Sequence, residues 1–273
     1  MPELVRACPY YTMFPLEFPL RVLKGARPAD WVLDPFCGRG TTLYAARLFG
    51  LRAAGVDVSP VAVAVSRAVL AAGSADQMLK LARGLLKAGP DGPVPAGPFW
   101  ELAYHPETLR DILSLRDGLS GAQGDTADLL RLMVLGRLHG PLRKVPTYFS
   151  NQMTRTFAPK PNYTVRYWQR WGLKPPKVDA LEVLGAAAGR YLTGLPPRVT
   201  GAASLGDART FDFLTLGGPY RYVVTSPPYP GMRTYVPDQW LRGWFVGGPP
   251  HPAYVYKGQL AARTLEGYTH DLS

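Results

Sequence analysis

The sequence predicts an α/β protein with a doubly wound parallel sheet and a mainly helical insertion. Over residues 29–72, a strand, a glycine loop, a helix, a second strand and a second helix follow one another, which is how such a sheet begins. Helical patterns without strand signals then occupy 74–194. We therefore expect one α/β domain from 1–73 and 195–273, split by the helical insertion.

Local signals define the first half of this α/β domain. The stretch "ADWVLD" at 29–34 predicts a short buried strand, and "PFCGRG" predicts a loop before the helix "TTLYAARLFG". Gly50 suits the position just beyond that helix, where a left-handed residue is favoured. The stretch "RAAGVDVSP" predicts a second strand that ends at Asp57, and Ser59 is expected to cap a helix whose first residue is Pro60.

The insertion and the later strands are predicted in the same way. Helices are expected at 75–88, 106–117, 126–138 and 179–192, with Pro/Gly linkers such as "AGPDGPVPAGP" between them. Strand signals resume at "RVTGAASLGDA" and "YRYVVTSPPY". We expect the last of these to be a buried strand that stops at Ser226, because the two prolines that follow fix φ and donate no backbone hydrogen bond.

Composition narrows the classes of partner. A net charge of +11 over 273 residues indicates a polyanionic partner. Nucleic acid is the first candidate and an anionic membrane is the second. The N-terminus lacks the pattern of a secretory signal, and the most apolar stretch, 61–72, is too short to span a bilayer and contains Ser66 and Arg67. The two cysteines, Cys8 and Cys37, have no metal-ligand spacing. We therefore expect a cytoplasmic protein without a metal site or a membrane partner.

The glycine loop has two acidic neighbours. Gly38 and Gly40 lie between a strand and a helix, where backbone can approach a ligand closely. Asp57 ends the next strand, where a carboxylate can bind ribose hydroxyls. A dinucleotide site would carry a third glycine where this chain has Leu43, and Asp34 would repel a pyrophosphate. Asp34 could pair instead with a cationic ligand such as the amino-acid end of S-adenosylmethionine.

Four segments together resemble a known family, the class I S-adenosylmethionine-dependent amino-methyltransferases of DNA. "DPFCGRGTT" resembles the first cofactor motif, and "TSPPY" resembles the catalytic motif, which begins with Asp, Asn or Ser in this family. "MFPLEFP" at 13–19 is similar to a segment beside the cofactor, and "GDA" at 206–208 is similar to the acidic adenine contact. The resemblance implies a Rossmann-like sheet, S-adenosylmethionine as cofactor and S-adenosylhomocysteine as product.

The resemblance also implies the site residues. Those expected at the cofactor are Phe14, Pro15, Asp34, Pro35, Phe36, Gly38, Gly40, Thr41, Thr42, Asp57, Val58 and Asp207. Those expected at the chemistry are Ser226, Pro227, Pro228 and Tyr229. Only 44 residues follow Tyr229, fewer than in most family members. We therefore expect the C-terminal strands to be missing, as in a truncated chain, a natural fragment or a compact variant.

The Ser-Pro-Pro-Tyr corner suggests a mechanism. An exocyclic amine on a base is a poor nucleophile, but the Ser226 hydroxyl and the Pro227 carbonyl could accept its two protons, while Tyr229 stacks on the flipped base. A first-position serine resembles the cytosine-N4 members of the family, whereas aspartate is commoner in the adenine-N6 members. Methylation at carbon 5 is disfavoured because neither Cys8 nor Cys37 follows a proline.

A basic segment at 137–177 holds nine Lys or Arg residues and no Asp or Glu. Aromatic and amide side chains are interleaved with them, a combination that suits nucleic acid. We expect a proline-punctuated loop, "FSNQMTRTFAPKPNY", that enters a groove or wraps a backbone. The expected DNA contacts are Arg143, Lys144, Asn151, Gln152, Arg155, Lys160, Tyr163 and Arg166.

These features predict a site-specific DNA methyltransferase that modifies the N4 amine of cytosine. Adenine-N6 methylation, methylation of RNA and a nucleic-acid-binding fragment without activity are the alternatives. The expected partner is double-stranded DNA with a flipped target base, and a cognate restriction endonuclease is a further one. The expected location is the prokaryotic cytoplasm, at the nucleoid.

Overall fold

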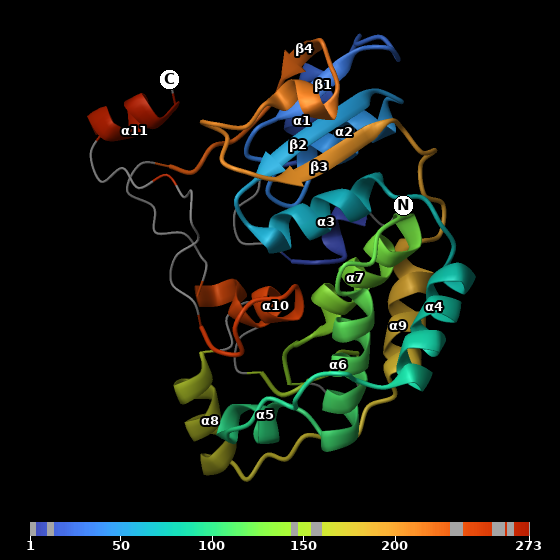
Figure 1. Ribbon diagram of the computed structural model, residues 1–273, viewed down its shortest axis with the longest axis vertical. Coiled ribbons are helices and arrows are strands. Elements are labelled where there is room, and N and C mark those ends of the chain that lie inside the picture. Colours follow the sequence, from blue (N-terminus) through green and yellow to red (C-terminus); the bar gives the residue numbers. More distant parts are fainter. Residues whose placement is uncertain are drawn as a thin grey trace. The chain divides into compact units, whose positions relative to one another are not determined.

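The computed structural model describes residues 4–9, 14–142, 147–153, 160–229, 237–252, 260 and 265–272. The chain forms two compact units, each built from three separate segments (Figure 1). The α/β unit comprises Tyr10–Ala72, Pro196–Val236 and Ala253–Ser273. The helical unit comprises Met1–Pro9, Gly73–Leu195 and Pro237–Pro252.

Strands and helices alternate in the α/β unit, whereas every element in the described part of the helical unit is a helix. The elements of the α/β unit are α1 (Glu17–Val22), β1 (Trp31–Asp34), α2 (Thr41–Leu48), β2 (Arg52–Asp57), α3 (Pro60–Leu70), β3 (Gly201–Leu205), η2 (Phe213–Leu216), β4 (Tyr220–Val223) and α11 (Leu265–Leu272). Those of the helical unit are η1 (Leu4–Arg6), α4 (Ala75–Ala88), α5 (Pro98–Ala103), α6 (Pro106–Leu119), α7 (Asp125–Arg137), α8 (Pro161–Arg170), α9 (Ala180–Tyr191), η3 (Pro237–Gln239) and α10 (Trp240–Phe245).

The sheet is parallel, with the strand order β3-β2-β1-β4. This confirms the predicted α/β class and is compatible with a Rossmann-like methyltransferase fold. All four residues of the central strand β1 are buried. The prediction that the last strand is buried was wrong: β4 lies at an edge of the described sheet, and Val223 is 62% exposed. No further strand follows β4 among the residues that the structure describes.

Capping explains where the predicted helices begin and end. Ser59 accepts a hydrogen bond from the Ala62 amide at 3.3 Å, and Pro60 occupies the first position of α3, as predicted. Gly50, beyond α2, has φ of 70°, which only glycine adopts without strain. The four helices predicted in the insertion are all present. Helices α5 and α8 were not predicted, because Pro98 and Pro161, their first residues, look like breakers in a Pro-rich sequence.

A buried arginine, Arg47 on α2, holds the α/β unit together where the chain leaves it and returns. Its guanidinium donates to the carbonyls of Val69 and Ala71, both at 2.8 Å, just before the chain enters the helical unit. It also donates to the carbonyls of Pro196 at 2.7 Å and Pro197 at 3.1 Å, just after the chain comes back. These bonds satisfy a cation that is 1% exposed.

A second buried arginine, Arg242 on α10, joins the three segments of the helical unit. It donates to the carbonyl of Pro9 at 2.8 Å, to that of Leu135 at 3.1 Å and to Gln239 Oε1 at 2.8 Å. These acceptors come from the first, second and third segments respectively. One side chain therefore closes a unit whose parts are far apart in the sequence.

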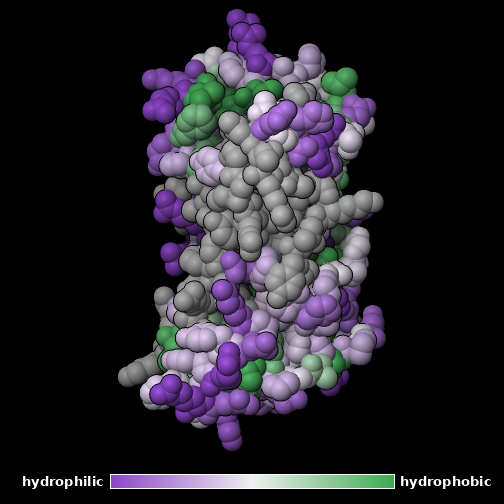
Figure 2. Space-filling model, turned by 90° about the vertical axis from the view of Figure 1, so that its left-hand side faces the viewer, coloured by the Kyte–Doolittle hydropathy of each residue, from purple (hydrophilic) through white to green (hydrophobic). Residues whose placement is uncertain are grey.

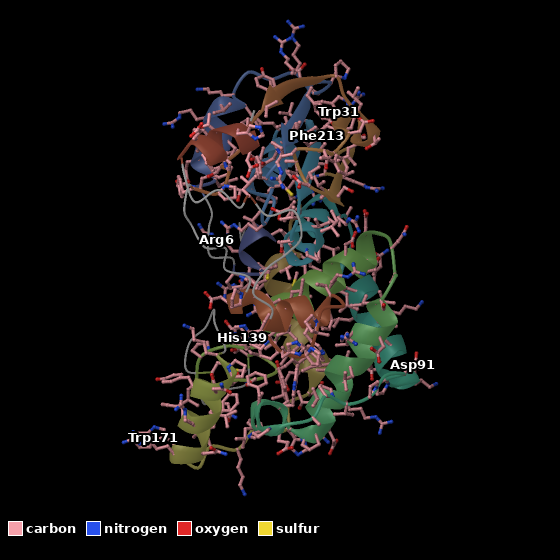
Figure 3. All side chains as sticks on the ribbon, turned by 60° about the vertical axis from the view of Figure 1, so that its left-hand side comes forward. Arg6, Trp31, Asp91, His139, Trp171 and Phe213 are labelled. Carbon is pink, nitrogen blue, oxygen red and sulfur yellow. The ribbon has the colours of Figure 1, made fainter. Side chains whose placement is uncertain are left out.

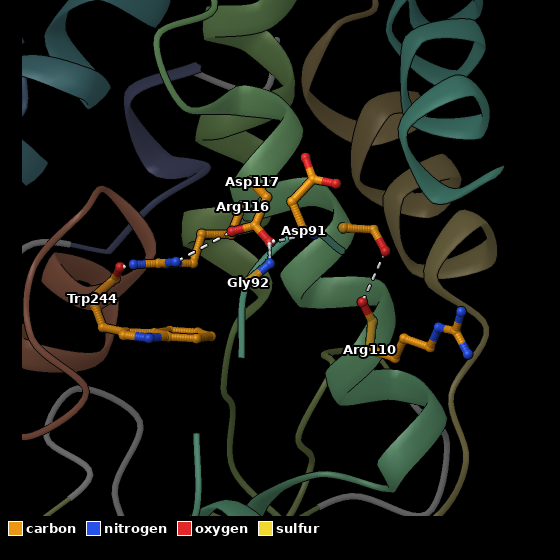
Figure 4. Close-up of polar contacts among 7 residues, drawn as sticks. Asp91, Gly92, Arg110, Arg116, Asp117 and Trp244 are labelled. Atoms are coloured by element: carbon orange, nitrogen blue, oxygen red, sulfur yellow. Dashed lines mark hydrogen bonds and ion pairs between the residues drawn. The ribbon is translucent and has the colours of Figure 1, made fainter. Parts of the chain in front are cut away.

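Contacts of α6 with the linker after α4 and with α10 stabilise the same unit (Figure 4). The Asp117 carboxylate accepts from the amides of Asp91 at 3.1 Å and Gly92 at 3.0 Å, which fixes the linker after α4. Arg116 donates through Nε to the Trp244 carbonyl at 3.0 Å, and its guanidinium lies 5.3 Å from the Trp244 ring centre.

Among the described helices, none is long and apolar enough to cross a membrane.

Candidate active site at the ends of the parallel strands

Four predicted site residues lie beyond or at the carboxyl ends of the four strands. Asp34 ends β1 and Asp57 ends β2, while Asp207 follows β3 and Ser226 follows β4 by a few residues. Because the strands are parallel, these ends meet at one edge of the sheet, where open α/β sheets bind their ligands. The structure therefore brings the predicted cofactor loop and the predicted catalytic corner to the same edge.

The glycine loop is fixed by hydrogen bonds from both sides. The Gly38 amide donates to Asp57 Oδ2 at 2.9 Å, and the Gly40 amide donates to the Cys37 carbonyl at 2.7 Å. Ser66 of α3 donates through Oγ to the Gly38 carbonyl at 2.9 Å, a support that the sequence analysis missed. Both glycines have positive φ, 51° at Gly38 and 81° at Gly40. A Cβ on Gly38 would meet no atom within 4 Å, so this stretch of backbone is open to a ligand.

Asp34 is the most unusual carboxylate of the site. It is 1% exposed, and its Oδ1 accepts from the Thr225 hydroxyl at 2.6 Å and the Phe36 amide at 3.2 Å. Its Oδ2 is buried and has no hydrogen-bond partner. Burial raises the pKa of Asp34 to about 6, although interactions with Thr225, Thr42 and Phe36 oppose the rise. An unsatisfied buried carboxylate oxygen favours a cationic donor as its ligand.

The carboxylate of Asp57 is committed to the loop but retains acceptor capacity. Its Oδ2 accepts from Gly38, as above, and its Oδ1 accepts from the Ser59 amide at 2.8 Å. Burial raises the pKa of Asp57, and the bonds from Ser59 and Gly38 oppose the rise. An ionised carboxylate has about four lone-pair sites, so hydroxyl groups of a ligand could still donate to it.

Asp207 has a strong ionic partner. Arg209 donates to both of its oxygens, from Nε at 2.9 Å and from Nη2 at 2.6 Å, and these bonds lower the pKa of Asp207. The same guanidinium reaches Asp271 of α11 at 2.9 Å. Arg209 therefore fixes the Asp207 carboxylate, an interaction that the sequence pattern did not reveal.

Two threonines link the cofactor loop to the catalytic corner. Thr225 donates to Asp34 across 191 residues of sequence, and Thr42 of α2 donates through Oγ1 to the Val224 carbonyl at 3.1 Å. The corner beyond them is accessible: Ser226 is exposed, and Tyr229 is 66% exposed. Sequence reasoning quoted Thr225 within the motif but gave it no role, because its partner is distant in the sequence.

The other predicted site residues differ in their burial. Thr41 is buried at the start of α2, while Pro35, Phe36 and Val58 are partly buried. Pro227 and Pro228 are also partly buried. Phe14 lies edge-to-face against Phe18 with ring centres 5.6 Å apart, and Pro15 is exposed.

Cys37 is a packing residue in this loop. It is 4% exposed, and burial raises the pKa of its thiol well above the ordinary value. A Cβ on Gly55 of β2 would lie 2.8 Å from the Cys37 Cβ, so the glycine leaves room for this side chain.

The predicted DNA contacts separate into three groups. Arg143, Lys144 and Arg155 lie outside the described residues. Lys160, Tyr163 and Arg166 are exposed at the start of α8 or on it. Asn151 and Gln152 are 3% and 4% exposed, with their amides bonded to the Tyr148 and Leu102 carbonyls. These two amides support the helical unit and face no solvent, so they do not belong to a DNA surface in this structure.

One family model matches the stretch of the chain that contains the glycine loop. Residues 7–67 match the family model described as DNA methylase, of the N6/N4 type. The matched stretch includes β1, the glycine loop and β2 with Asp34 and Asp57. The match supports a DNA methyltransferase of the N4/N6 family, a family that generally uses S-adenosylmethionine, and does not distinguish cytosine from adenine. No curated protein and no solved structure matched the chain.

Proposed function

We propose that this protein is an S-adenosylmethionine-dependent DNA methyltransferase that modifies the exocyclic N4 amine of cytosine. The observation that carries the proposal is the 2.6 Å hydrogen bond from Thr225 to Asp34. It joins the Ser-Pro-Pro-Tyr corner directly to the acidic residue of the glycine loop. A cofactor held at that loop and a base held at that corner would therefore be neighbours.

The residues present fit the cofactor. Asp34 Oδ2 is a buried acceptor without a partner, which suits the ammonium group of an amino acid. Asp57 retains acceptor sites for ribose hydroxyls, and the open side of Gly38 lets a ligand approach the backbone. When bound, S-adenosylmethionine supplies an activated methyl group, so the protein has chiefly to orient the acceptor amine.

The corner supplies that orientation. The Ser226 hydroxyl and the Pro227 carbonyl accept hydrogen bonds from the two amine protons, which turns the nitrogen lone pair toward the methyl group. Tyr229, two-thirds exposed, offers a ring for stacking on a flipped base. The two prolines keep this geometry rigid because their φ angles are fixed. Thr225 is a positioning residue, since it holds the corner against Asp34.

Adenine-N6 methylation is the second candidate, because adenine also presents an exocyclic amine to the same two acceptors. Ser226 at the first motif position is the feature that favours cytosine. The proposal places the protein at the nucleoid of a prokaryotic cell, where a cognate restriction endonuclease would cut the same unmodified sequence.

Mass spectrometry of nucleosides tests the proposal. The protein is incubated with mixed-sequence duplex DNA and S-adenosylmethionine, and the DNA is then digested. We expect N4-methylcytosine, a loss of most product in Ser226→Ala, and little change in the control Ser120→Ala, which alters an exposed serine of the helical unit. If N6-methyladenine forms instead, the substrate is adenine and not cytosine. If neither nucleoside forms although S-adenosylmethionine binds, the catalytic proposal is wrong.

A further inference from the structure

Helix α8 has a buried side that anchors it and an open side that is polar and basic. Trp168 is fully buried and donates through Nε1 to the Gln152 carbonyl at 2.7 Å. Thr164 is also buried and donates through Oγ1 to the Lys160 carbonyl at 2.8 Å. The side chains of the opposite face are exposed: Asn162, Tyr163, Arg166, Gln169 and Arg170. Their spacing of three and four residues aligns them in one stripe along the helix.

The charge on this face has no internal counterpart. No Asp or Glu occurs between Arg137 and Lys177 in the sequence. Among the described residues, Arg166 and Arg170 form no ion pair. The Arg170 guanidinium lies 5.7 Å from the ring centre of Trp171, which is 61% exposed. A negatively charged partner could therefore pair with two arginines that form no ion pair among the described residues.

The kinds of side chain on the stripe indicate which polyanion fits. Arginine, asparagine and glutamine are the residues that form paired hydrogen bonds with base edges in the major groove. An α-helix has a diameter of about 10–12 Å and the major groove of B-DNA is about 12 Å wide, so a helix enters it. The major groove of A-form RNA is too narrow for such reading. The lower part of the face in Figure 2, at the height of α8, is mainly hydrophilic.

We propose that the open face of α8 lies in the major groove of duplex DNA, with Arg166 and Gln169 at base edges. Lys160 and Arg170 are then placed to contact phosphates on either side. The choice of DNA rests on the proposed function, but the helix and its contacting residues are assigned from the geometry of the helical unit. This identifies α8 as the sequence-reading element of the protein.

The structure supplies an internal reporter for this contact. All six tryptophans of the chain are described, and five of them are 9% exposed or less. Trp171, at the outer end of α8, is the exposed one (Figure 3). Acrylamide, a neutral quencher, therefore acts mainly on Trp171 fluorescence. Duplex DNA bound along α8 should shield it, and Trp171→Phe should remove most of the quenchable signal with or without DNA.

Acrylamide quenching and the anisotropy of labelled duplex DNA are measured on the same full-length protein. We expect DNA to bind and to reduce the quenchable fraction. The double variant Arg166→Ala/Arg170→Ala should bind about tenfold or more weakly, with a smaller dependence on salt. Its matched control is Arg83→Ala/Lys87→Ala on α4, which removes two exposed positive charges from the same unit and should bind like the parent.

The outcomes separate the two proposals. If DNA binds while Trp171 stays equally quenchable and the α8 variant keeps its affinity, the assignment of α8 is overturned, whereas the methyltransferase proposal stands or falls on the nucleoside measurement. If duplex RNA binds as tightly as duplex DNA and shields Trp171 equally, the major-groove assignment is overturned. If the parent protein binds no DNA at all, both proposals fail.

Discussion

Replacing Asp34 with asparagine should remove a pH-dependent loss of stability and weaken cofactor binding. The wild-type carboxylate is 1% exposed, and one of its oxygens has no hydrogen-bond partner. Asparagine keeps an oxygen that can accept from Thr225 and Phe36, but it carries no charge. The variant therefore removes the cost of a buried charge and, with it, the group proposed to bind the ammonium of S-adenosylmethionine.

The magnitude follows from the pKa. Burial raises the pKa of Asp34 from 3.8 to about 6, so the folded state holds this proton more tightly than the unfolded state does. The resulting stabilisation is present below pH 3.8 and is lost as the pH rises through about 6. A rise of the pKa from 3.8 to about 6 corresponds to about 3 kcal/mol of stability, of which about 1.4 kcal/mol is lost between about pH 5 and about pH 8. Asparagine does not titrate and loses nothing over this range.

Urea denaturation of both proteins across this pH range measures the effect. The free energy of unfolding of Asp34→Asn minus that of the wild type should increase with pH by about 1.4 kcal/mol. Asp91→Asn, which makes the same substitution at an exposed aspartate, is the control. Isothermal titration should show S-adenosylmethionine binding about tenfold or more weaker in Asp34→Asn. A flat difference for Asp34→Asn would refute the buried charge, and unchanged titration would refute its role as a ligand.

Two further substitutions test the packing of the α/β unit, with urea denaturation as the measurement. Gly40→Ala should destabilise the protein by about 2–5 kcal/mol, because φ is 81° and the new Cβ would lie 2.7 Å from Val69 Cγ2. Gly38→Ala, where a Cβ has free space, should cost only about 1–2 kcal/mol. Equal costs for the two variants would contradict the close contact at Gly40. Arg47→Leu should cost about 3 kcal/mol or more, because it leaves four backbone carbonyls without this donor, and a change below about 1 kcal/mol would show that the arginine holds no such junction.

Sequence patterns predicted those parts of the fold that depend on residues close together in the chain. Ser59 and Pro60 marked the start of α3 because capping involves atoms within a few residues. The burial of β4 was mispredicted because it depends on neighbours: an edge strand and a central strand can both be rich in β-branched and aromatic residues. The proline at the start of α8 concealed a helix, since the same residue ends helices and begins them.

The candidate site shows the same division. Asp34, Gly38, Gly40 and Asp57 could be identified from one stretch of sequence, and the structure places them around one loop. The bond from Thr225 to Asp34 could not be predicted, because it spans 191 residues and depends on the pairing of β4 with β1. Composition alone likewise could not separate exposed from buried amides in the basic segment.

The three-segment closure at Arg242 has a consequence for synthesis. The acceptor carbonyl at Pro9 is made early and the one at Leu135 midway, but the arginine itself is translated last. During translation, the helices of the middle segment must therefore persist without α10 until α10 itself, which ends at Phe245, has left the ribosome. For the same reason, a helical cassette cut at residues 73 and 195 would lack both the donor and its N-terminal acceptor.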